Sequence, residues 1–277
     1  MGLLSLEAIV ADVMTHDVFT LSPSHSLPLA DTMMTLRHIR HIPVVDDAHR
    51  LVGLVTHRDL MKAQLSALSP LSKDERSTLE LAIPISKIMQ KEVWTIAPSA
   101  RAAQAAQLLR DHRFGCLPVT EHGRLVGIVS ESDLLQLLAQ PGPSVPAPQH
   151  WPIKQFMTGA PVTITLDTSL AEARLAFEQH HIHHLPVLSE GRAIGIVHER
   201  DIRVAEAIFG ASQNTRAVHV AQLLGDIHSD HARPDEALAV VLERMIRDRV
   251  DAVVVVENDV LCGIFTLVDA CRVLTVR

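Results

Sequence analysis

The sequence is poor in aromatic residues, with two tryptophans, six phenylalanines and no tyrosine among 277 residues. Few rings leave few platforms on which nucleic-acid bases could stack. The net charge of −7 also lacks the basic excess that is typical of nucleic-acid-binding proteins. We therefore expect no nucleic-acid partner.

Long hydrophobic runs and paired cysteines are missing too. No segment reaches the roughly 18 apolar residues of a membrane span, and the start MGLLSLEAIVADVM has no basic n-region, so it predicts a short helix rather than a signal peptide. Cys116, Cys262 and Cys271 show no metal-ligand spacing, and an odd number of cysteines suits thiols in a reducing compartment. These absences favour a cytoplasmic protein without membrane association.

Catalytic signatures are equally scarce. The sequence contains no arrangement typical of a Ser-His-Asp or Cys-His nucleophile, no P-loop and no glycine-rich dinucleotide loop. We therefore expect a protein that is not an enzyme.

What fills the chain is one pattern in four copies. A short β-branched run, a polar turn and a second apolar run containing glycine end each time in an aspartate, and the shared glycines lie 74, 68 and 68 residues apart. A repeat of this length is closer to a small domain than to a solenoid turn. The copies run from His41 to Asp59, Cys116 to Asp133, His184 to Asp201 and Ala252 to Asp269, with glycines Gly53, Gly127, Gly195 and Gly263.

Each copy predicts the element order strand, helix, strand, strand, helix. Upstream of each hairpin, apolar residues recur in steps of three and four, as on one face of a helix, and Ser26, Ser99 and Ser169 are candidate N-caps. Two apolar runs around a polar turn predict a hairpin, and an amphipathic helix follows it.

A lone unit of about 60 residues is marginally stable, so we expect an α+β fold in which adjacent repeats pack as two pairs. The proline-rich stretch PGPSVPAPQH predicts a linker between the pairs. The predicted boundaries are 8–66 and 83–140 for the first two repeats, 141–150 for the linker, and 151–209 and 218–277 for the last two.

The chain resembles the cystathionine-β-synthase (CBS) domain family over nearly its whole length. The resemblance rests on M-T-x-x-V at the start of a repeat, the I/L-P-V strand, and G-[IL]-V-[TS]-x-x-D at the end of the hairpin. It implies paired repeats, called Bateman modules, whose clefts bind adenosine-containing ligands. The four-repeat layout is similar to that of the gamma subunit of AMP-activated protein kinase.

The aspartate after each hairpin is the first candidate ligand residue, because a carboxylate can accept hydrogen bonds from both ribose hydroxyls. Three residues earlier, a hydroxyl could reach ribose or phosphate in repeats one, two and four, whereas repeat three has a histidine. The alternative is that each aspartate only caps the following helix. These candidates are Asp59, Asp133, Asp201 and Asp269, with Thr56, Ser130, His198 and Thr266 before them.

Positive charge alternates between repeats. Before the I/L-P-V strand, repeat one has Arg40-His41 and repeat three has His183-His184, whereas repeats two and four have Gly115-Cys116 and Asp251-Ala252. Before the final aspartate, repeats one and three have Arg58 and Arg200. Since phosphate recognition requires positive charge, we expect one phosphate-bearing site in each pair. The basic side chains could instead solvate helix ends.

The first strand carries aligned threonines, Thr20, Thr95 and Thr163, at positions where family sites grip the purine. Repeat four has His231 there. The resemblance assigns Thr20 and Thr163 to the ligand site.

The cluster HHIHH, with His180, His181, His183 and His184, suggests a metal site. Because it spans a helix end and a strand start, the four rings cannot all face one centre, and we expect no metal there. Histidines in a phosphate site should make the affinity weaken above about pH 7.

The sequence thus predicts a regulatory protein that senses AMP, ADP or ATP, with or without Mg²⁺, and requires no cofactor. It would signal through module orientation, a homodimer or an effector protein. The alternatives are an oligomerisation module without nucleotide, and a sensor of S-adenosylmethionine or NAD.

Overall fold

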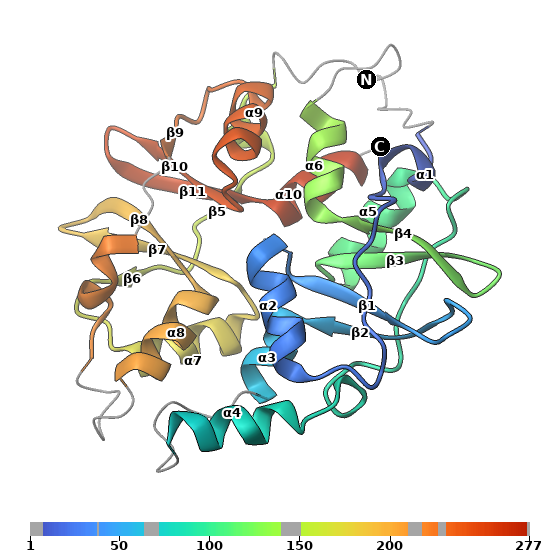
Figure 1. Cartoon of the computed structure of the whole chain (residues 1–277). Coiled ribbons are helices and arrows are strands. Elements are labelled where there is room, and N and C mark those ends of the chain that lie inside the picture. Colours follow the sequence, from blue (N-terminus) through green and yellow to red (C-terminus); the bar gives the residue numbers. More distant parts are fainter. Residues whose placement is uncertain are drawn as a thin grey trace. The chain divides into compact units, whose positions relative to one another are not determined.

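The structure is a computed structural model that describes residues 8–37, 39–63, 72–139, 151–209, 218–226 and 231–275. The chain divides into two compact units (Figure 1). Unit 1 comprises residues 1–137 and 274–277, and unit 2 comprises residues 138–273. The predicted linker, 141–150, lies outside the described residues.

Unit 1 contains the first two repeats. Its elements are α1 (Val10–Val13), α2 (Leu27–Arg37), β1 (His41–Val45), β2 (Leu51–Thr56), α3 (His57–Ala63), α4 (Lys73–Leu81), the 3-10 helix η1 (Ile85–Lys87), α5 (Ala102–His112), β3 (Cys116–Glu121), β4 (Arg124–Ser130) and α6 (Glu131–Ala139).

Unit 2 contains the last two repeats. Its elements are the 3-10 helix η3 (Ile153–Gln155), β5 (Thr158–Gly159), β6 (Ile164–Thr165), α7 (Leu170–His180), β7 (His184–Ser189), β8 (Arg192–His198), α8 (Glu199–Phe209), the 3-10 helix η5 (Val220–Asp226), β9 (His231–Ala232), α9 (Leu238–Asp248), β10 (Ala252–Glu257), β11 (Val260–Thr266) and α10 (Leu267–Thr275).

The predicted order of strand, helix, strand, strand and helix is confirmed in all four repeats. The antiparallel hairpins are β1–β2, β3–β4, β7–β8 and β10–β11, each with a register shift just after the residue opposite the shared glycine. The first strand is very short and pairs in parallel with the hairpin. It is β6 beside β7 and β9 beside β10 in unit 2, and single bridges from Leu21 to Val44 and from Ile96 to Val119 in unit 1.

One predicted N-cap is wrong, and one helix was not predicted. Ser99 does not cap α5, because the residue before that helix is Arg101, which makes no side-chain cap. Ser169 does cap α7, where it forms a capping box with Glu172. The sequence analysis did not assign α4, although Ser72 and Glu75 form the same capping box at its start.

The repeats of each unit exchange their N-terminal segments. The first backbone N–H of each long helix donates to a carbonyl from the partner repeat, at 2.8–3.0 Å. Helix starts have unpaired N–H groups, so this exchange satisfies donors that the repeat itself leaves open. The four bonds run from Ala102 to Ala8, Leu27 to Ile83, Leu238 to Trp151 and Leu170 to Val218.

The exchanged segments also enter the partner's hydrophobic core. Ile85, which precedes repeat two's helix, is fully buried among core residues of repeat one such as Leu27 and Ile42. Val218 and Val220, which precede repeat four's helix, are buried in the core of repeat three. Pairing of repeats one with two and three with four therefore follows from covalent order and from shared cores.

No helix among the described residues is long and apolar enough to cross a membrane.

Candidate functional site

The candidate aspartates lie at the start of the helix after each hairpin, as the third residue of that helix. In repeat one, Oδ2 of Asp59 accepts hydrogen bonds from the backbone N and the Oγ1 of Thr56, at 2.9 and 2.7 Å. The amide of Asp59 donates to Oγ1 of Thr56 at 3.3 Å. This reciprocal arrangement is a capping box, so the residue that caps α3 is Thr56 and not the aspartate.

Repeats two and four build the same corner. Ser130 and Asp133 form it at the start of α6, with oxygen–oxygen and nitrogen–oxygen distances of 2.6 and 2.7 Å. Thr266 and Asp269 form it at the start of α10, at 2.8 and 2.9 Å. One carboxylate oxygen, Oδ2, is used for the start of the helix in each case.

Repeat three differs because His198 replaces the hydroxyl residue. The backbone N of His198 still donates to Oδ2 of Asp201, at 3.0 Å. Nδ1 of its imidazole accepts from the amide of Arg200 at 3.4 Å, and Nε2 lies 3.6 Å from Oδ2 of Asp251. The corner of Asp201 is thus retained without the hydroxyl that the other repeats share.

The second carboxylate oxygen meets a residue of the exchanged N-terminal segment. Oδ1 of Asp133 accepts from Oγ1 of Thr15 at 3.4 Å, and Oδ1 of Asp269 accepts from Oγ1 of Thr158 at 3.0 Å. In repeat one the corresponding donor is Nε2 of Gln90, 3.5 Å from Oδ1 of Asp59. The sequence analysis assigned no role to these three residues, although Thr15 and Thr158 are the threonines of the M-T motif and Gln90 follows Met89 at the same place.

Burial sets the corner of repeat four apart, since Asp133 is half-buried like Asp59 and Asp201. Asp269 is 2% exposed, and Arg272 adds a contact at 3.1 Å to the same Oδ1. Burial raises the pKa of Asp269 and of Asp133, and it outweighs the hydrogen bonds that favour the ionised form. Asp59 is half-buried, and the side chain of Asp201 is 29% exposed.

The candidate arginines lie at the surface near the odd-numbered corners. Arg40 and Arg58 are exposed, and Arg200 is half-exposed with its Nε 3.4 Å from Oδ1 of Asp201. Arg40 is fixed to the corner through its backbone, because its carbonyl accepts from the amide of His57, the first residue of α3, at 2.8 Å. The corresponding carbonyl of His183 accepts from Glu199 at 3.0 Å. Each unit therefore holds basic residues beside the aspartate of its odd-numbered repeat.

His41 lies at the contact between repeats one and two. A Cβ atom on Gly115 would be 2.7 Å from Cε1 of His41, so the ring occupies the space that the missing side chain leaves. Burial, with a smaller effect of the Arg40 charge, lowers the pKa of His41 to about 4. His41 is therefore a neutral hydrogen-bonding group at pH 7, and the predicted weakening of affinity above about pH 7 cannot come from it.

The histidines of HHIHH are spread over different surroundings. His180 ends α7, and His181 caps it in a left-handed conformation at φ 51°. His183 lies 2.7 Å from Glu199, as measured from Nδ1 to Oε2. His184 begins β7 and faces His198 across the hairpin.

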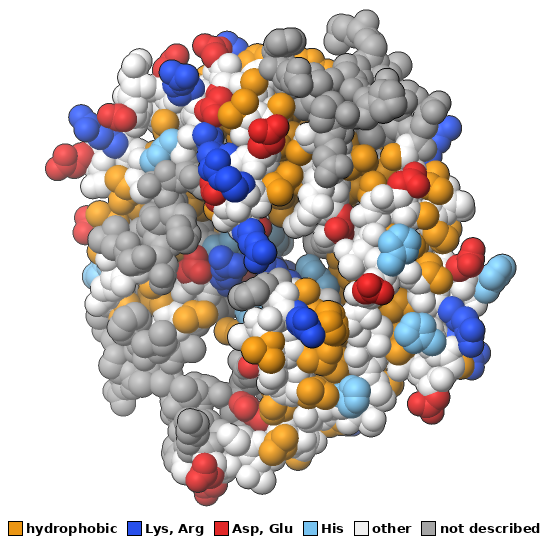
Figure 2. Space-filling view, turned by 45° about the horizontal axis from the view of Figure 1, so that its top comes forward, with side chains coloured by type: hydrophobic (Ala, Val, Ile, Leu, Met, Phe, Trp, Pro, Cys, Tyr) orange, Lys and Arg blue, Asp and Glu red, His pale blue; other side chains and the backbone are white. Residues whose placement is uncertain are grey.

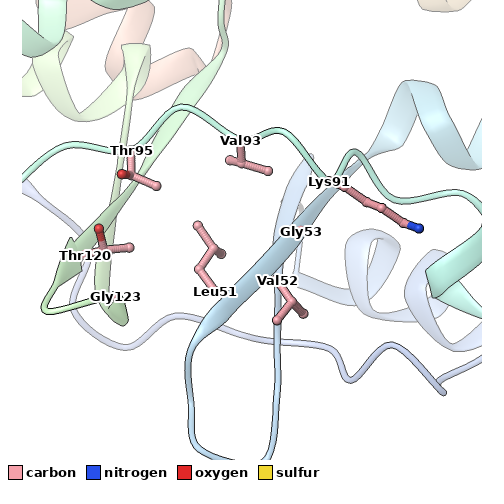
Figure 3. Close-up of a pocket in the computed structure, with 8 residues that line it drawn as sticks. All are labelled: Leu51, Val52, Gly53, Lys91, Val93, Thr95, Thr120 and Gly123. Atoms are coloured by element: carbon pink, nitrogen blue, oxygen red, sulfur yellow. The ribbon is translucent and has the colours of Figure 1, made fainter.

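The aligned threonines lie at the edge of the short first strand. Thr20 is half-buried and directly precedes Leu21, while Thr163 is exposed and directly precedes β6. Thr95 lines a cavity of about 170 Å³ in unit 1 together with Thr120 (Figure 3). The remaining lining residues are Leu51, Val52, Gly53, Lys91, Val93 and Gly123.

This cavity is smaller than the 300–1,000 Å³ usual for small-molecule sites. A second cavity, of about 340 Å³, lies beside Arg233, Glu236 and Asn258 in unit 2. Neither cavity is lined by the corner aspartates. On the face drawn in Figure 2, basic and acidic side chains are interspersed.

The protein consists of four α+β repeats in tandem. They pack as two pairs, and the repeats of each pair exchange their N-terminal segments. The CBS domain profile matches residues 10–66, 85–140, 153–207 and 225–276. The chain belongs to the CBS domain family. CBS pairs are regulatory ligand-binding modules, and those of this kind are typically non-catalytic.

Comparisons with known proteins agree with this assignment. A CBS domain-containing protein of Dictyostelium discoideum is 34% identical over 48% of this chain and 92% of its own length. A homoserine O-acetyltransferase of Methanohalophilus mahii is 31% identical over a match that spans 47% of this chain and 24% of that relative.

A solved structure has the same four-repeat layout. Protein MJ1225 of Methanocaldococcus jannaschii, proposed as an archaeal homolog of g-AMPK, superposes with a TM-score of 0.74. The match covers 96% of this chain and 99% of that protein, at 21% identity. The predicted likeness of layout to the gamma subunit is thus confirmed at the level of the fold.

Proposed function

We propose that the chain is a sensor of adenine nucleotides, with one phosphate-bearing site in each unit, anchored on repeats one and three. The observation that carries this proposal is the difference between the corners. Asp59 and Asp201 are partly exposed beside Arg58 and Arg200. Asp133 is also half-buried but has Ser132 in place of the arginine, and Asp269 is buried and held by three side chains.

At the odd-numbered corners, the backbone N–H of Thr56 or His198 donates to one oxygen of the aspartate, and the partly exposed carboxylate can still accept from ribose hydroxyls. Arg58 and Arg200 are one residue away on the first helical turn, where a guanidinium can pair with phosphate. Arg40 adds charge in repeat one, and His183 and His184 take the corresponding positions in repeat three. This charge favours AMP, ADP or ATP over ligands without a terminal phosphate.

Ligand binding would regulate through the paired repeats. A nucleotide shifts an equilibrium only when it binds one arrangement more tightly than another. The exchanged N-terminal segments connect the corners of repeats one, two and four to the partner repeat through Gln90, Thr15 and Thr158. The output would be a changed homodimer or an effector protein in the cytoplasm, and the proposal requires no Mg²⁺ site.

The test is calorimetry and thermal unfolding of the whole chain with AMP, ADP, ATP, S-adenosylmethionine and NAD. A ligand at 100 times its Kd stabilises the protein by about 2.7 kcal/mol. The double variant Arg58→Gln/Asp59→Asn should lose the response of unit 1, and Arg200→Gln/Asp201→Asn that of unit 2. The matched control is Ser132→Ala/Asp133→Asn in repeat two, which should keep both responses.

Absence of heat and of stabilisation with every phosphorylated nucleotide would favour the second candidate function, an oligomerisation module without nucleotide. Binding of S-adenosylmethionine alone would show that the sites bind an adenosyl ligand without a phosphate, and would contradict the assignment of AMP, ADP or ATP.

A further inference from the structure

A second kind of site is built into unit 2, where three potential metal ligands converge. His184 and His198 are paired residues of the β7–β8 hairpin, so their side chains lie on the same face of the sheet. Their ring centroids are 4.4 Å apart, in an edge-to-face arrangement. The hairpin therefore presents two imidazoles side by side.

The third group comes from the partner repeat. Asp251, directly before β10, points its carboxylate to this pair, with Oδ2 3.6 Å from Nε2 of His198. Among the described residues, one ligand atom from each of His184, His198 and Asp251 lies within 4.8 Å of the others. The side chains of His198 and Asp251 are 19% and 17% exposed, so the group is shielded but open to small solutes.

The same place in unit 1 lacks the ligand set. The repeat alignment gives His41, Thr56 and Gly115 as the corresponding residues, and His41 pairs with Thr56 in the β1–β2 hairpin as His184 does with His198. There the ring of His41 packs against Gly115, where unit 2 has Asp251. Unit 2 therefore has two potential ligands, His198 and Asp251, at positions where unit 1 has a threonine and a glycine.

Two imidazoles and a carboxylate are ligands that Zn²⁺, Co²⁺, Ni²⁺ and Cu²⁺ accept, whereas Mg²⁺ and Ca²⁺ prefer oxygen alone. We propose that His184, His198 and Asp251 bind a late divalent transition-metal ion such as Zn²⁺, with its remaining coordination positions open to water or to a phosphate oxygen. The site stands on these three residues and does not depend on nucleotide binding.

The geometry requires a small adjustment. Bonds of about 2.0–2.1 Å at the tetrahedral angle put ligand atoms about 3.4 Å apart. The distance between His198 and Asp251 is already near this value. The widest separation, at most 4.8 Å, must shorten by up to about 1.4 Å, which side-chain rotation can supply. If Nε2 of His198 binds the metal, its Nδ1 carries the proton, and the 3.4 Å hydrogen bond from the amide of Arg200 to Nδ1 is given up.

The experiment uses the full chain, stripped of metal and free of nucleotide. Titration with Co²⁺, followed by displacement with Zn²⁺, should give one tight equivalent with the visible absorption of four- or five-coordinate cobalt. Even outer-shell partners are worth about 10–100-fold in metal affinity. Loss of a ligand in His198→Thr or Asp251→Asn should therefore weaken this equivalent by more than about 100-fold. Mg²⁺ should not compete.

Two features keep the result decisive. His198→Thr introduces the residue that repeats one and four carry at this position, so the variant should fold and form the capping box with Asp201. The control is His180→Ala, which removes an exposed histidine of the same repeat and should leave the tight equivalent intact. Unchanged affinity in both ligand variants, or no tight equivalent in the wild type, would overturn the proposal, since the other histidines of the chain would then account for any binding.

Discussion

Met89 packs against Gly53, with its Sδ 2.7 Å from the position that a Cβ on the glycine would take. The two residues belong to different repeats, since Met89 lies on the exchanged segment of repeat two and Gly53 on β2 of repeat one. The same contact joins Met14 to Gly127 and Met157 to Gly263. In repeats one, two and four, the N-terminal segment of the partner repeat therefore packs on the shared glycine.

Gly53→Ala should destabilise unit 1 by about 1–3 kcal/mol, because the added methyl group overpacks this contact. The carbonyl of Gln90 lies 3.0 Å from the same position, so a rotation of Met89 alone cannot relieve the crowding. Urea unfolding measures the loss. The control is Gly159→Ala, where no heavy atom lies within 4 Å of an added Cβ. Equal stabilities of the two variants would contradict the packing role.

Asp269 should make the stability of the protein fall with rising pH. Because burial raises the pKa of Asp269 above its unfolded value, its contribution to the unfolding free energy is complete below about pH 4 and is lost as the pH rises through the folded pKa. In Asp269→Asn this loss is absent. Urea unfolding between pH 4 and 7 should show that the unfolding free energy of the variant rises relative to that of the wild type as the pH increases. Asp167→Asn, at an exposed position, should show no such trend.

His41 should stay neutral down to about pH 5. Its pKa is lowered from 6.5 to about 4, so the unfolded chain binds a proton first and the unfolding free energy falls as pH drops from 6.5 to 4. NMR titration of the ring protons, assigned with His41→Gln, gives this pKa directly. A midpoint near 6.5 would show that the ring is solvated rather than packed against Gly115.

The fold followed from the sequence because the repeats are long and strongly periodic. The hairpins, the helices after them and the pairing were predicted from apolar spacing. The cap of α5 was misplaced because Ser99 is two residues too early for a helix that begins at Ala102. Helix α4 was overlooked because it lies between repeats, outside the repeated pattern.

The site was predictable only as far as one repeat extends. The corner aspartates and the basic residues beside them are local to a repeat, and alignment revealed them. The side chains that reach each corner from elsewhere, Gln90, Thr15 and Thr158, depend on the exchange of N-terminal segments, which alignment does not show. For the same reason Asp251, facing His198 from another repeat, could not be found from the HHIHH cluster.

The exchanged N-terminal segments also bear on how such a chain can be cut or duplicated. A gene fragment that encodes one repeat would produce a helix whose first backbone N–H has no acceptor. Its glycine-containing strand would lack the partner's segment, and its own hydrophobic N-terminal segment would have no core to enter. Two such fragments could satisfy these groups only by associating with each other as separate molecules. A protein of this type should therefore gain or lose its modules two at a time, and its smallest independently folding piece is the pair.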